Sequence, residues 1–411
     1  MNQVDTIVVG AGQAGLATSR LLVEAGRDHL VVERGRIGQR WRSERWDSLR
    51  LLTPNWMTRL PHATYDGDDP DGFMPAAELA SRFERYAAGF DAPVREDTPV
   101  LAVRPDGDGY TVVTGDGTWS CRNVIVASGW FAEPSVPVWA ANLDAAIAQV
   151  HSSRYRNPAS LPDGGVLVVG ASASGVQIAD ELRRDGRTVA IAAGSHTRLP
   201  RTYRGRDVMW WMEGLGILDD RTEDVPEHAR RQPSLQLVGR SGGADLDLGT
   251  LAAAGVLVLG RLGTIDGTVA HAAGDLIAAT DDADRRLRRL LDRIDGRIAG
   301  EGLEGEVPPA DPIRPVTVGP GPCSLDLRAA GIRSVVWATG HRPAFPWLDV
   351  PVLRPTGAIE QRAGVTAAPG LYTVGMRWQS RRSSTFIDGV RHDAAAVVKH
   401  IVTRRQSPVA A

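Results

Sequence analysis

A strand, a glycine-rich turn and a helix occur twice in this chain, about 160 residues apart, and no other feature constrains the fold as strongly. The first copy has a β-branched strand at 6–9, Gly-Ala-Gly-Gln-Ala-Gly at 10–15, a Leu- and Ala-rich helix at 14–25 and a strand at 29–33. The second has a strand at 166–169, Gly-Ala-Ser-Ala-Ser-Gly at 170–175, a helix at 176–184 and a strand at 188–192. We therefore predict an α/β fold with two Rossmann-like dinucleotide-binding domains.

The glycines of the first turn each have a steric role in binding a diphosphate. Gly10 permits the tight turn, Gly12 lets the backbone approach a pyrophosphate, and Gly15 lets the helix pack close to the strand. The diphosphate would lie on the helix N-terminus. Glu33 ends the second strand, where a carboxylate binds a ribose 2′-OH and repels a 2′-phosphate. This pattern predicts FAD or NAD at the first site, with candidate residues Gly10, Gly12, Gln13, Ala14, Gly15, Glu33 and Arg34.

The second turn differs from the first in two ways that favour NADPH. Ser172 replaces the middle glycine, and serine is small and can donate a hydrogen bond to phosphate. No acid ends the second strand, which is followed instead by Ser195, His196, Arg198, Arg201 and Arg204. Arginines suit a 2′-phosphate, although the same residues could simply form a solvated surface. The candidate residues are Gly170, Ser172, Ala173, Ser174, Gly175, Ser195, Arg198 and Arg201.

Composition limits the remaining classes. A length of 411 residues predicts two or three domains, and a formal net charge of −2 gives no sign of a nucleic-acid partner. Cys121 and Cys323 are far apart in sequence and lack metal-ligand spacing, which is typical of reduced thiols in a cytoplasmic protein. The chain shows no basic leader and no apolar run long enough for a membrane span. We predict a first domain from 1–157 and 326–411, with the second domain, 158–325, inserted between its two parts.

Several further motifs resemble the flavin-containing (class B) monooxygenases of the N-hydroxylating and Baeyer–Villiger type, in particular their short bacterial subgroup. Val-Ile-Val-Ala-Ser-Gly at 124–129 and Val-Val-Trp-Ala-Thr-Gly at 335–340 are similar to the strand ends that link the family's domains. Gly-Gln-Arg-Trp at 38–41 is similar to its flavin-side segment, 151–155 to its His-Ser-x-x-Tyr fingerprint, and 384–394 to its C-terminal flavin segment. Two features of the family are absent. The fingerprint's usual Phe-x-Gly start is replaced by Ala145 and Ile147, and the asparagine near the flavin is replaced by Leu52 or Thr53.

This resemblance implies a glutathione-reductase-like FAD domain with an inserted NADPH domain. It adds cofactor candidates at Gln39, Trp41, Trp46, Val100, Ala127, Ser128, Gly129, Ala338, Thr339, Gly340 and Asp388. Its candidates near the reacting atoms are His151, Arg377, Trp378 and Thr385. The segments 41–60 and 209–218 are expected to line the substrate pocket.

The implied activity is a monooxygenase in which NADPH reduces FAD and O2 adds to give a C4a-(hydro)peroxyflavin. One oxygen atom then enters a small molecule by N- or S-oxygenation or by Baeyer–Villiger insertion. The expected partners are this substrate and O2, without metal, nucleic acid or membrane span, and a homodimer is compatible with the pattern. Two alternatives remain open: an NADPH-dependent flavin or quinone oxidoreductase without oxygenation, and a non-catalytic dinucleotide-sensing subunit.

Overall fold

The computed structural model describes residues 2–240, 245–310 and 312–404. The chain forms two main sheets, one for each predicted repeat, and the central strands of each sheet are parallel. The first sheet has the order β3-β2-β1-β6-β5-β4, with β21 also pairing β6. Its strands are β1 (Asn2–Val9), β2 (His29–Val32), β3 (Val94–Arg95), β4 (Val100–Asp106), β5 (Gly109–Thr114), β6 (Gly117–Val126) and β21 (Leu371–Thr373). β4, β5 and β6 form an antiparallel meander, as the Asp-Gly turns at 106–107 and 116–117 predict.

Alternate residues of these strands form two separate cores. Val8, Val31 and Ile125 pack under the helices α1 (Gln13–Glu24), α3 (Ala76–Ala88) and α9 (Val390–Thr403). Ile7 and Val124 point to the opposite face, which residues from the 345–359 segment cover. Burial on both faces explains why these central strands are continuous apolar runs.

The second sheet has the order β15-β10-β9-β19-β8, and all its strands are parallel. They are β8 (Ala148–His151), β9 (Gly165–Val169), β10 (Val189–Ala192), β15 (Leu257–Leu259) and β19 (Ile332–Trp337). Helices α4 (Ala173–Arg184) and α7 (Leu248–Ala253) pack on one face. The antiparallel strands β16 (Leu262–Asp266), β17 (Val269–Ala272) and β18 (Ser324–Asp326) cover the other. The order β15-β10-β9-β19 repeats β3-β2-β1-β6, so the predicted duplication and fold class are confirmed.

The chain crosses between the two sheets twice. It leaves after β6 through β7 (Glu133–Pro134) and returns after β19 through β20 (His341–Arg342), and these two short strands pair antiparallel. β8 and β19 belong to the second sheet, although the expected boundaries at 157/158 and 325/326 assigned them to the first domain. β19 pairs with β9, and β8 pairs with β19, so the second sheet extends past both expected boundaries.

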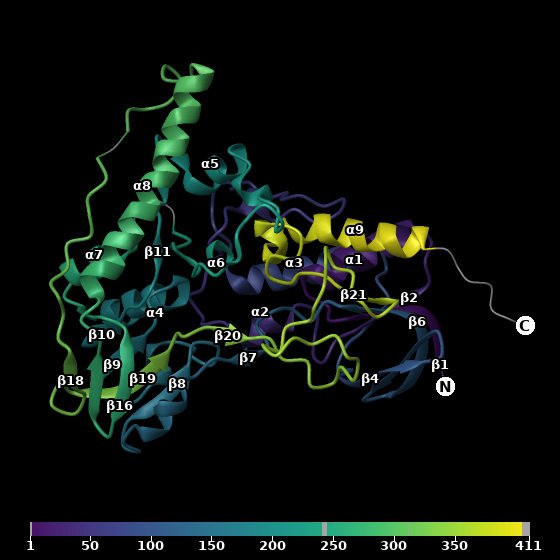
Figure 1. The fold of residues 1–411 in the computed structure, drawn as a ribbon, viewed down its shortest axis with the longest axis horizontal. Helices are drawn as coiled ribbons and strands as arrows, with labels where there is room; N and C mark the ends of the chain where they lie inside the picture. The colour runs from purple at the N-terminus through teal and green to yellow at the C-terminus, as the bar shows by residue number, and fades with distance from the viewer. Residues whose placement is uncertain (1, 241–244, 311, 405–411) are drawn as a thin grey trace, which may run out of the picture.

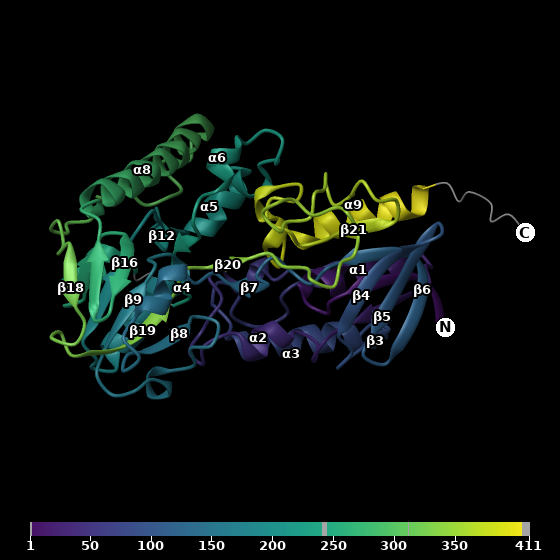
Figure 2. The same ribbon diagram turned by 60° about the horizontal axis from the view of Figure 1, so that its bottom comes forward.

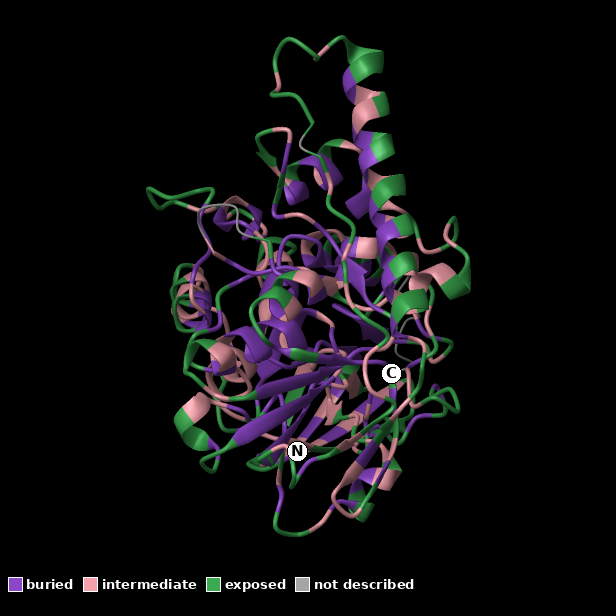
Figure 3. Cartoon of the chain, turned by 90° about the vertical axis from the view of Figure 1, so that its left-hand side faces the viewer, coloured by how far each residue is buried: buried purple, intermediate pink, exposed green. Residues whose placement is uncertain are grey.

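The fold of 210–307 is hard to assign from sequence, and this segment and the stretch 197–208 before it contain most of the remaining elements. These are β11 (Thr197–Arg198), β12 (Thr202–Tyr203), β13 (Arg206–Asp207), α5 (Val208–Gly214), α6 (Glu227–Arg230), β14 (Leu235–Gln236) and α8 (Leu276–Glu301). Helix α8 extends away from the rest of the chain (Figure 1), and its outer face is largely exposed (Figure 3). Its buried positions, including Leu287, Leu291 and Ile294, pack with α5 residues in one apolar cluster.

Candidate functional site

The first glycine turn leaves an open backbone cradle at the start of α1. Gly10 has φ +108°, and a Cβ there would lie 2.9 Å from the carbonyl oxygen of Ala127. A Cβ on Gly15 would lie only 1.8 Å from the carbonyl oxygen of Gly10, so α1 packs directly on the strand end. A Cβ on Gly12 would meet no atom within 4 Å, and no side chain caps α1. The first amides of the helix are therefore free for an anion such as a diphosphate.

Glu33 ties the end of β2 to this turn. It is buried, its Oε2 accepts a hydrogen bond from the Ala11 amide at 2.8 Å, and its Oε1 accepts one from the Gly35 amide at 3.2 Å. A carboxylate has about four acceptor positions, so two remain for ribose hydroxyl groups. Next to it, Arg34 is largely exposed and pairs with Glu44 at 2.8 Å. The residues present at the first turn fit an FAD or NAD adenosine half.

The second turn has the same backbone geometry as the first. Gly170 has φ +106°, and a Cβ on it would lie 2.4 Å from the carbonyl oxygen of Ala338. A Cβ on Gly175 would lie 1.8 Å from the carbonyl oxygen of Gly170, as at the first turn. Ser172 has φ −83° and ψ −170°, against −84° and −171° at Gly12, and its side chain does not cap α4. The substitution of serine therefore leaves the cradle intact.

The end of β10 lacks the carboxylate found at the end of β2. Ala193 occupies the position that corresponds to Glu33, and the exposed Ser195 follows two residues later. The turn is held instead by Gln236, whose Nε2 donates to the carbonyl oxygen of Ala171 at 2.6 Å. Gln236 was not found by sequence reasoning, because it lies 65 residues from its partner on the short strand β14.

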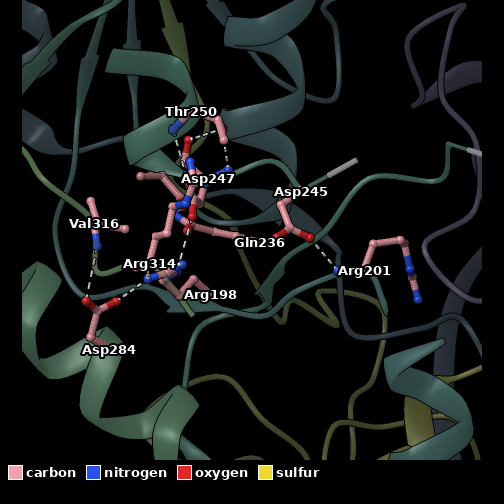
Figure 4. Close-up of polar contacts among 10 residues, drawn as sticks. Arg198, Arg201, Gln236, Asp245, Asp247, Thr250, Asp284, Arg314 and Val316 are labelled. Carbon is pink, nitrogen blue, oxygen red and sulfur yellow. Dashed lines mark hydrogen bonds and ion pairs between the residues drawn. The ribbon is translucent and has the colours of Figure 1, made fainter. Parts of the chain in front are cut away.

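The two arginines predicted to bind a 2′-phosphate have internal partners. Arg198 is buried, and its Nε and Nη1 lie 3.2 Å from Asp247 and 2.5 Å from Asp284 (Figure 4). Arg201 is buried, pairs with Asp207 at 2.5 Å and donates to the carbonyl oxygen of Leu52 at 2.8 Å. The structure therefore does not present either guanidinium as an open cation at the end of β10. Their pairing aspartates are the N-cap residues of α5 and α7 and a residue of α8, which the sequence pattern did not place next to the strand.

The predicted flavin-side residues Gln39 and Trp41 lie on α2 (Gln39–Ser43), and Trp46 lies just after it. The Nε1 of Trp41 donates to Gln13 of the first turn at 3.4 Å, while Trp46 is buried against the second domain's core. Gln39 instead accepts a hydrogen bond from the Arg36 amide at 3.1 Å. Val100 is the first residue of β4. The backbone segments at Gly129 and Gly340, which follow β6 and β19, are open where a Cβ would stand.

Asp388 links this region to the second domain. Arg59 forms a bidentate ion pair with Asp388 at 2.8 and 2.9 Å, and it also binds Glu213 of α5. Further ion pairs join Arg381 to Asp219 and Arg382 to Asp220, each near 217–219. In two views α5 lies between α8 and α9 (Figures 1 and 2). Ion pairs thus hold residues 213–220 against Arg59 and the C-terminal segment.

His151 lies at the end of β8, in the second sheet. Its Nε2 donates to the carbonyl oxygen of Gly340 at 2.9 Å, since a carbonyl can only accept, and its Nδ1 accepts from Ser153 at 2.9 Å. Burial lowers the pKa of His151 below its ordinary value, so the neutral imidazole is favoured. The ring of His341 packs edge-on against it at 4.8 Å between centroids. This histidine pair joins the end of β8 to β20, the chain's second crossing, and the Nε2 of His151 is occupied by the Gly340 carbonyl.

The other three candidates follow β21 in the first domain. Arg377 donates to the carbonyl oxygens of Arg230 and Gln232, whereas Trp378 is buried, has φ +52° and lies under the guanidinium of Arg382. Thr385 ends a 3-10 turn at 382–385. These three residues are grouped with Asp388 by sequence position, and His151 lies in a separate sheet. Within the described ranges, no cluster of acidic, His or Cys side chains could hold a metal, and no helix combines the length and apolar character of a membrane span.

Comparisons with known proteins agree with this geometry. The family model for pyridine nucleotide-disulphide oxidoreductases matches residues 7–208. A CzcO-like oxidoreductase of Geobacillus kaustophilus is 31% identical over 407 residues, covering 97% of this chain and 98% of that protein. The probable indole-3-pyruvate monooxygenase YUCCA4 of Arabidopsis thaliana is 31% identical over 204 residues, or 48% of this chain and 49% of that protein.

Two solved structures share the fold along nearly the whole chain. A flavin-containing monooxygenase from Stenotrophomonas maltophilia has a TM-score of 0.69 and 20% identity, covering 98% of each chain. A bacillithiol disulfide reductase from Staphylococcus aureus has a TM-score of 0.62 and 12% identity, covering 99% of this chain and 100% of that one. The same fold is therefore found in a flavin-containing monooxygenase and in a disulfide reductase. The sequence identity to the Geobacillus protein establishes that this chain belongs to the CzcO-like oxidoreductases.

Proposed function

We propose that this protein is an FAD- and NADPH-dependent monooxygenase that inserts one oxygen atom into a small molecule, by N- or S-oxygenation or by Baeyer–Villiger insertion. The observation that carries the proposal is the pair of matching backbone cradles, one with a carboxylate at the neighbouring strand end and one without. The first cradle would hold FAD through Gly12 and Glu33, and the second would hold NADPH through Ser172 and its helix amides. When bound, the flavin and nicotinamide supply the hydride transfer and oxygen chemistry.

The protein's part is to orient the two cofactors and to exclude water. Trp211, Met209 and Leu237 of the second domain pack with Met57 of the flavin-side segment in one apolar cluster, with Phe386 partly buried against it. This cover would keep bulk water from the reacting atoms. The neutral, hydrogen-bonded His151 would keep the joint between the domains in place without acting as an acid.

The similarity to monooxygenases favours oxygenation over simple reduction, and the cysteines support this choice. Cys121 is buried on β6, where burial raises its pKa to about 12, and Cys323 is exposed beside β18. The chain's only two cysteines therefore lie on different elements, one within β6 and one just before β18, and Cys121 is held as an unreactive thiol. A disulfide-exchange reaction through a cysteine pair has no support in this arrangement.

Product analysis under isotopic oxygen tests the proposal. The purified protein should be yellow, NADPH should bleach it, and amines, sulfides and ketones should be screened with 18O2. A product that gains one 18O atom per NADPH consumed supports the monooxygenase. Turnover that needs no oxygen and proceeds with a quinone as acceptor would establish the reductase instead, and a colourless protein that takes up no FAD would refute both.

A further inference from the structure

The adenosine end of the second cradle needs a cation that the predicted arginines do not supply. In a unit of this kind, the ribose 2′ substituent lies near the end of the second strand, here β10. Arg198 and Arg201 are buried in internal ion pairs, and Arg204 pairs with Asp295 at 2.8 Å. A phosphate with two negative charges in this position requires a partner from another element.

Arg261 meets this requirement from the neighbouring strand. β10 and β15 are parallel, with Ala192 opposite Leu259, so both strands end at the same edge of the sheet. Arg261 follows β15 by two residues, and its side chain lies over Gly194, just beyond β10. A Cβ built on Gly194 would be 3.5 Å from the Nε of Arg261 and 3.8 Å from its Cζ. The guanidinium therefore lies where the 2′ substituent is expected.

The backbone around Arg261 is fixed while its guanidinium remains accessible. The Arg261 amide donates to Asp275 at 2.9 Å, and its carbonyl oxygen accepts from the Ala273 amide at 2.8 Å. The side chain is 60% exposed, and its contact with the Asp275 carboxylate is long, 3.5 Å at Nε. The two Nη atoms make no hydrogen bond to the described residues, which leaves their donors for a ligand. Exposed Ser195, next to Gly194, adds a hydroxyl donor.

We propose that Arg261, with Ser195, binds the 2′-phosphate of NADPH and sets the preference for NADPH over NADH. The inference rests on the proposed function, because it assumes that the second cradle holds a nicotinamide dinucleotide. Guanidinium geometry suits a phosphate, which can accept two parallel hydrogen bonds from its fork. The absence of a carboxylate at Ala193 removes the repulsion that Glu33 would create in the first unit.

Coenzyme binding by matched variants tests this assignment. The dissociation constants of NADPH and NADH would be measured from flavin reduction, and those of 2′,5′-ADP and 5′-AMP by calorimetry. Arg261→Ala should weaken NADPH and 2′,5′-ADP about tenfold and change NADH and 5′-AMP by less than about twofold. Arg261→Lys should recover part of the loss, because it keeps the charge. The difference should shrink as salt is raised, since the site is exposed.

Arg328→Ala provides the control. Arg328 lies in the same domain, is 61% exposed and has a similarly long contact of 3.4 Å with Asp144. It precedes β19, however, and so lies at the amino-terminal end of the parallel strands, whereas Arg261 lies at their carboxyl-terminal end. If Arg261→Ala and Arg328→Ala weaken NADPH binding equally, or if Arg261→Ala leaves the preference for NADPH unchanged, the assignment of Arg261 is wrong but the proposed function stands. A wild-type protein that binds FAD but neither nicotinamide dinucleotide would overturn the proposed function as well.

Discussion

Replacement of Gly12 by valine separates ligand binding from folding at the first cradle. Gly12 has φ −84° and ψ −171°, an extended conformation that valine adopts readily, and a Cβ there meets no protein atom within 4 Å. The change should therefore cost the empty protein about 1 kcal/mol at most, as expected for a poorer helix N-cap. The valine methyl groups would instead fill the space that a diphosphate needs to reach the amides of Gln13 and Ala14.

The expected loss of FAD affinity follows from those amides. Two hydrogen bonds to a charged group, at about 1.5–3 kcal/mol each, give a loss of about 3–6 kcal/mol. This corresponds to about a hundredfold to ten-thousandfold weaker binding of FAD. The ratio of absorbance at 450 nm and 280 nm after purification would report the flavin retained, and urea unfolding of the flavin-free protein would report its stability.

Gly15→Ala is the matched control, because its Cβ would lie 1.8 Å from the Gly10 carbonyl oxygen and no cofactor is involved in that contact. It should destabilise the flavin-free protein by about 1–3 kcal/mol through overpacking, whereas Gly12→Val should leave the flavin-free protein nearly as stable as the wild type. If Gly12→Val retains FAD at the wild-type ratio, or if both variants lose stability equally in the flavin-free state, the account of the cradle is wrong.

Three further predictions use the second domain and the joint. Ser172→Val should retain FAD but slow its reduction by NADPH at least tenfold, because the second cradle is blocked while the first is intact. Stopped-flow spectroscopy would measure the rate of flavin reduction, and an unchanged rate would contradict the prediction. Arg198→Ala should lower the free energy of unfolding by about 3–5 kcal/mol, measured in urea, because it leaves Asp247 and Asp284 buried without a cation; a change in coenzyme preference without destabilisation would contradict this. Burial, with the nearby His151, Arg45 and Arg40, lowers the pKa of His341 to about 4, below its unfolded value near 6.5. The unfolded chain then binds more protons between these values, so stability should be full above pH 6.5 and fall as the pH drops toward 4, and His341→Phe should flatten this dependence in urea titrations.

The amino-acid sequence alone was enough to predict both nucleotide-binding units and, from the Asp-Gly turns, the hairpins of the 100–126 meander. Each of these depends on signals within about thirty residues: a steric demand for glycine at 10 and 15, strand alternation, or turn residues at 106–107. Such demands act on the local backbone, so they can be read without knowing what lies across the fold.

Only the tertiary structure decided which polar groups stand free at those units. Arg198, at 86 residues from Asp284, is buried in an ion pair, while Arg261, at the end of another strand, lies over Gly194. In the sequence, a buried, ion-paired arginine and an exposed arginine look the same. Whether it binds a ligand or a carboxylate of the protein depends on which distant segments pack beside it, because desolvation and pairing are set by three-dimensional neighbours rather than by chain neighbours.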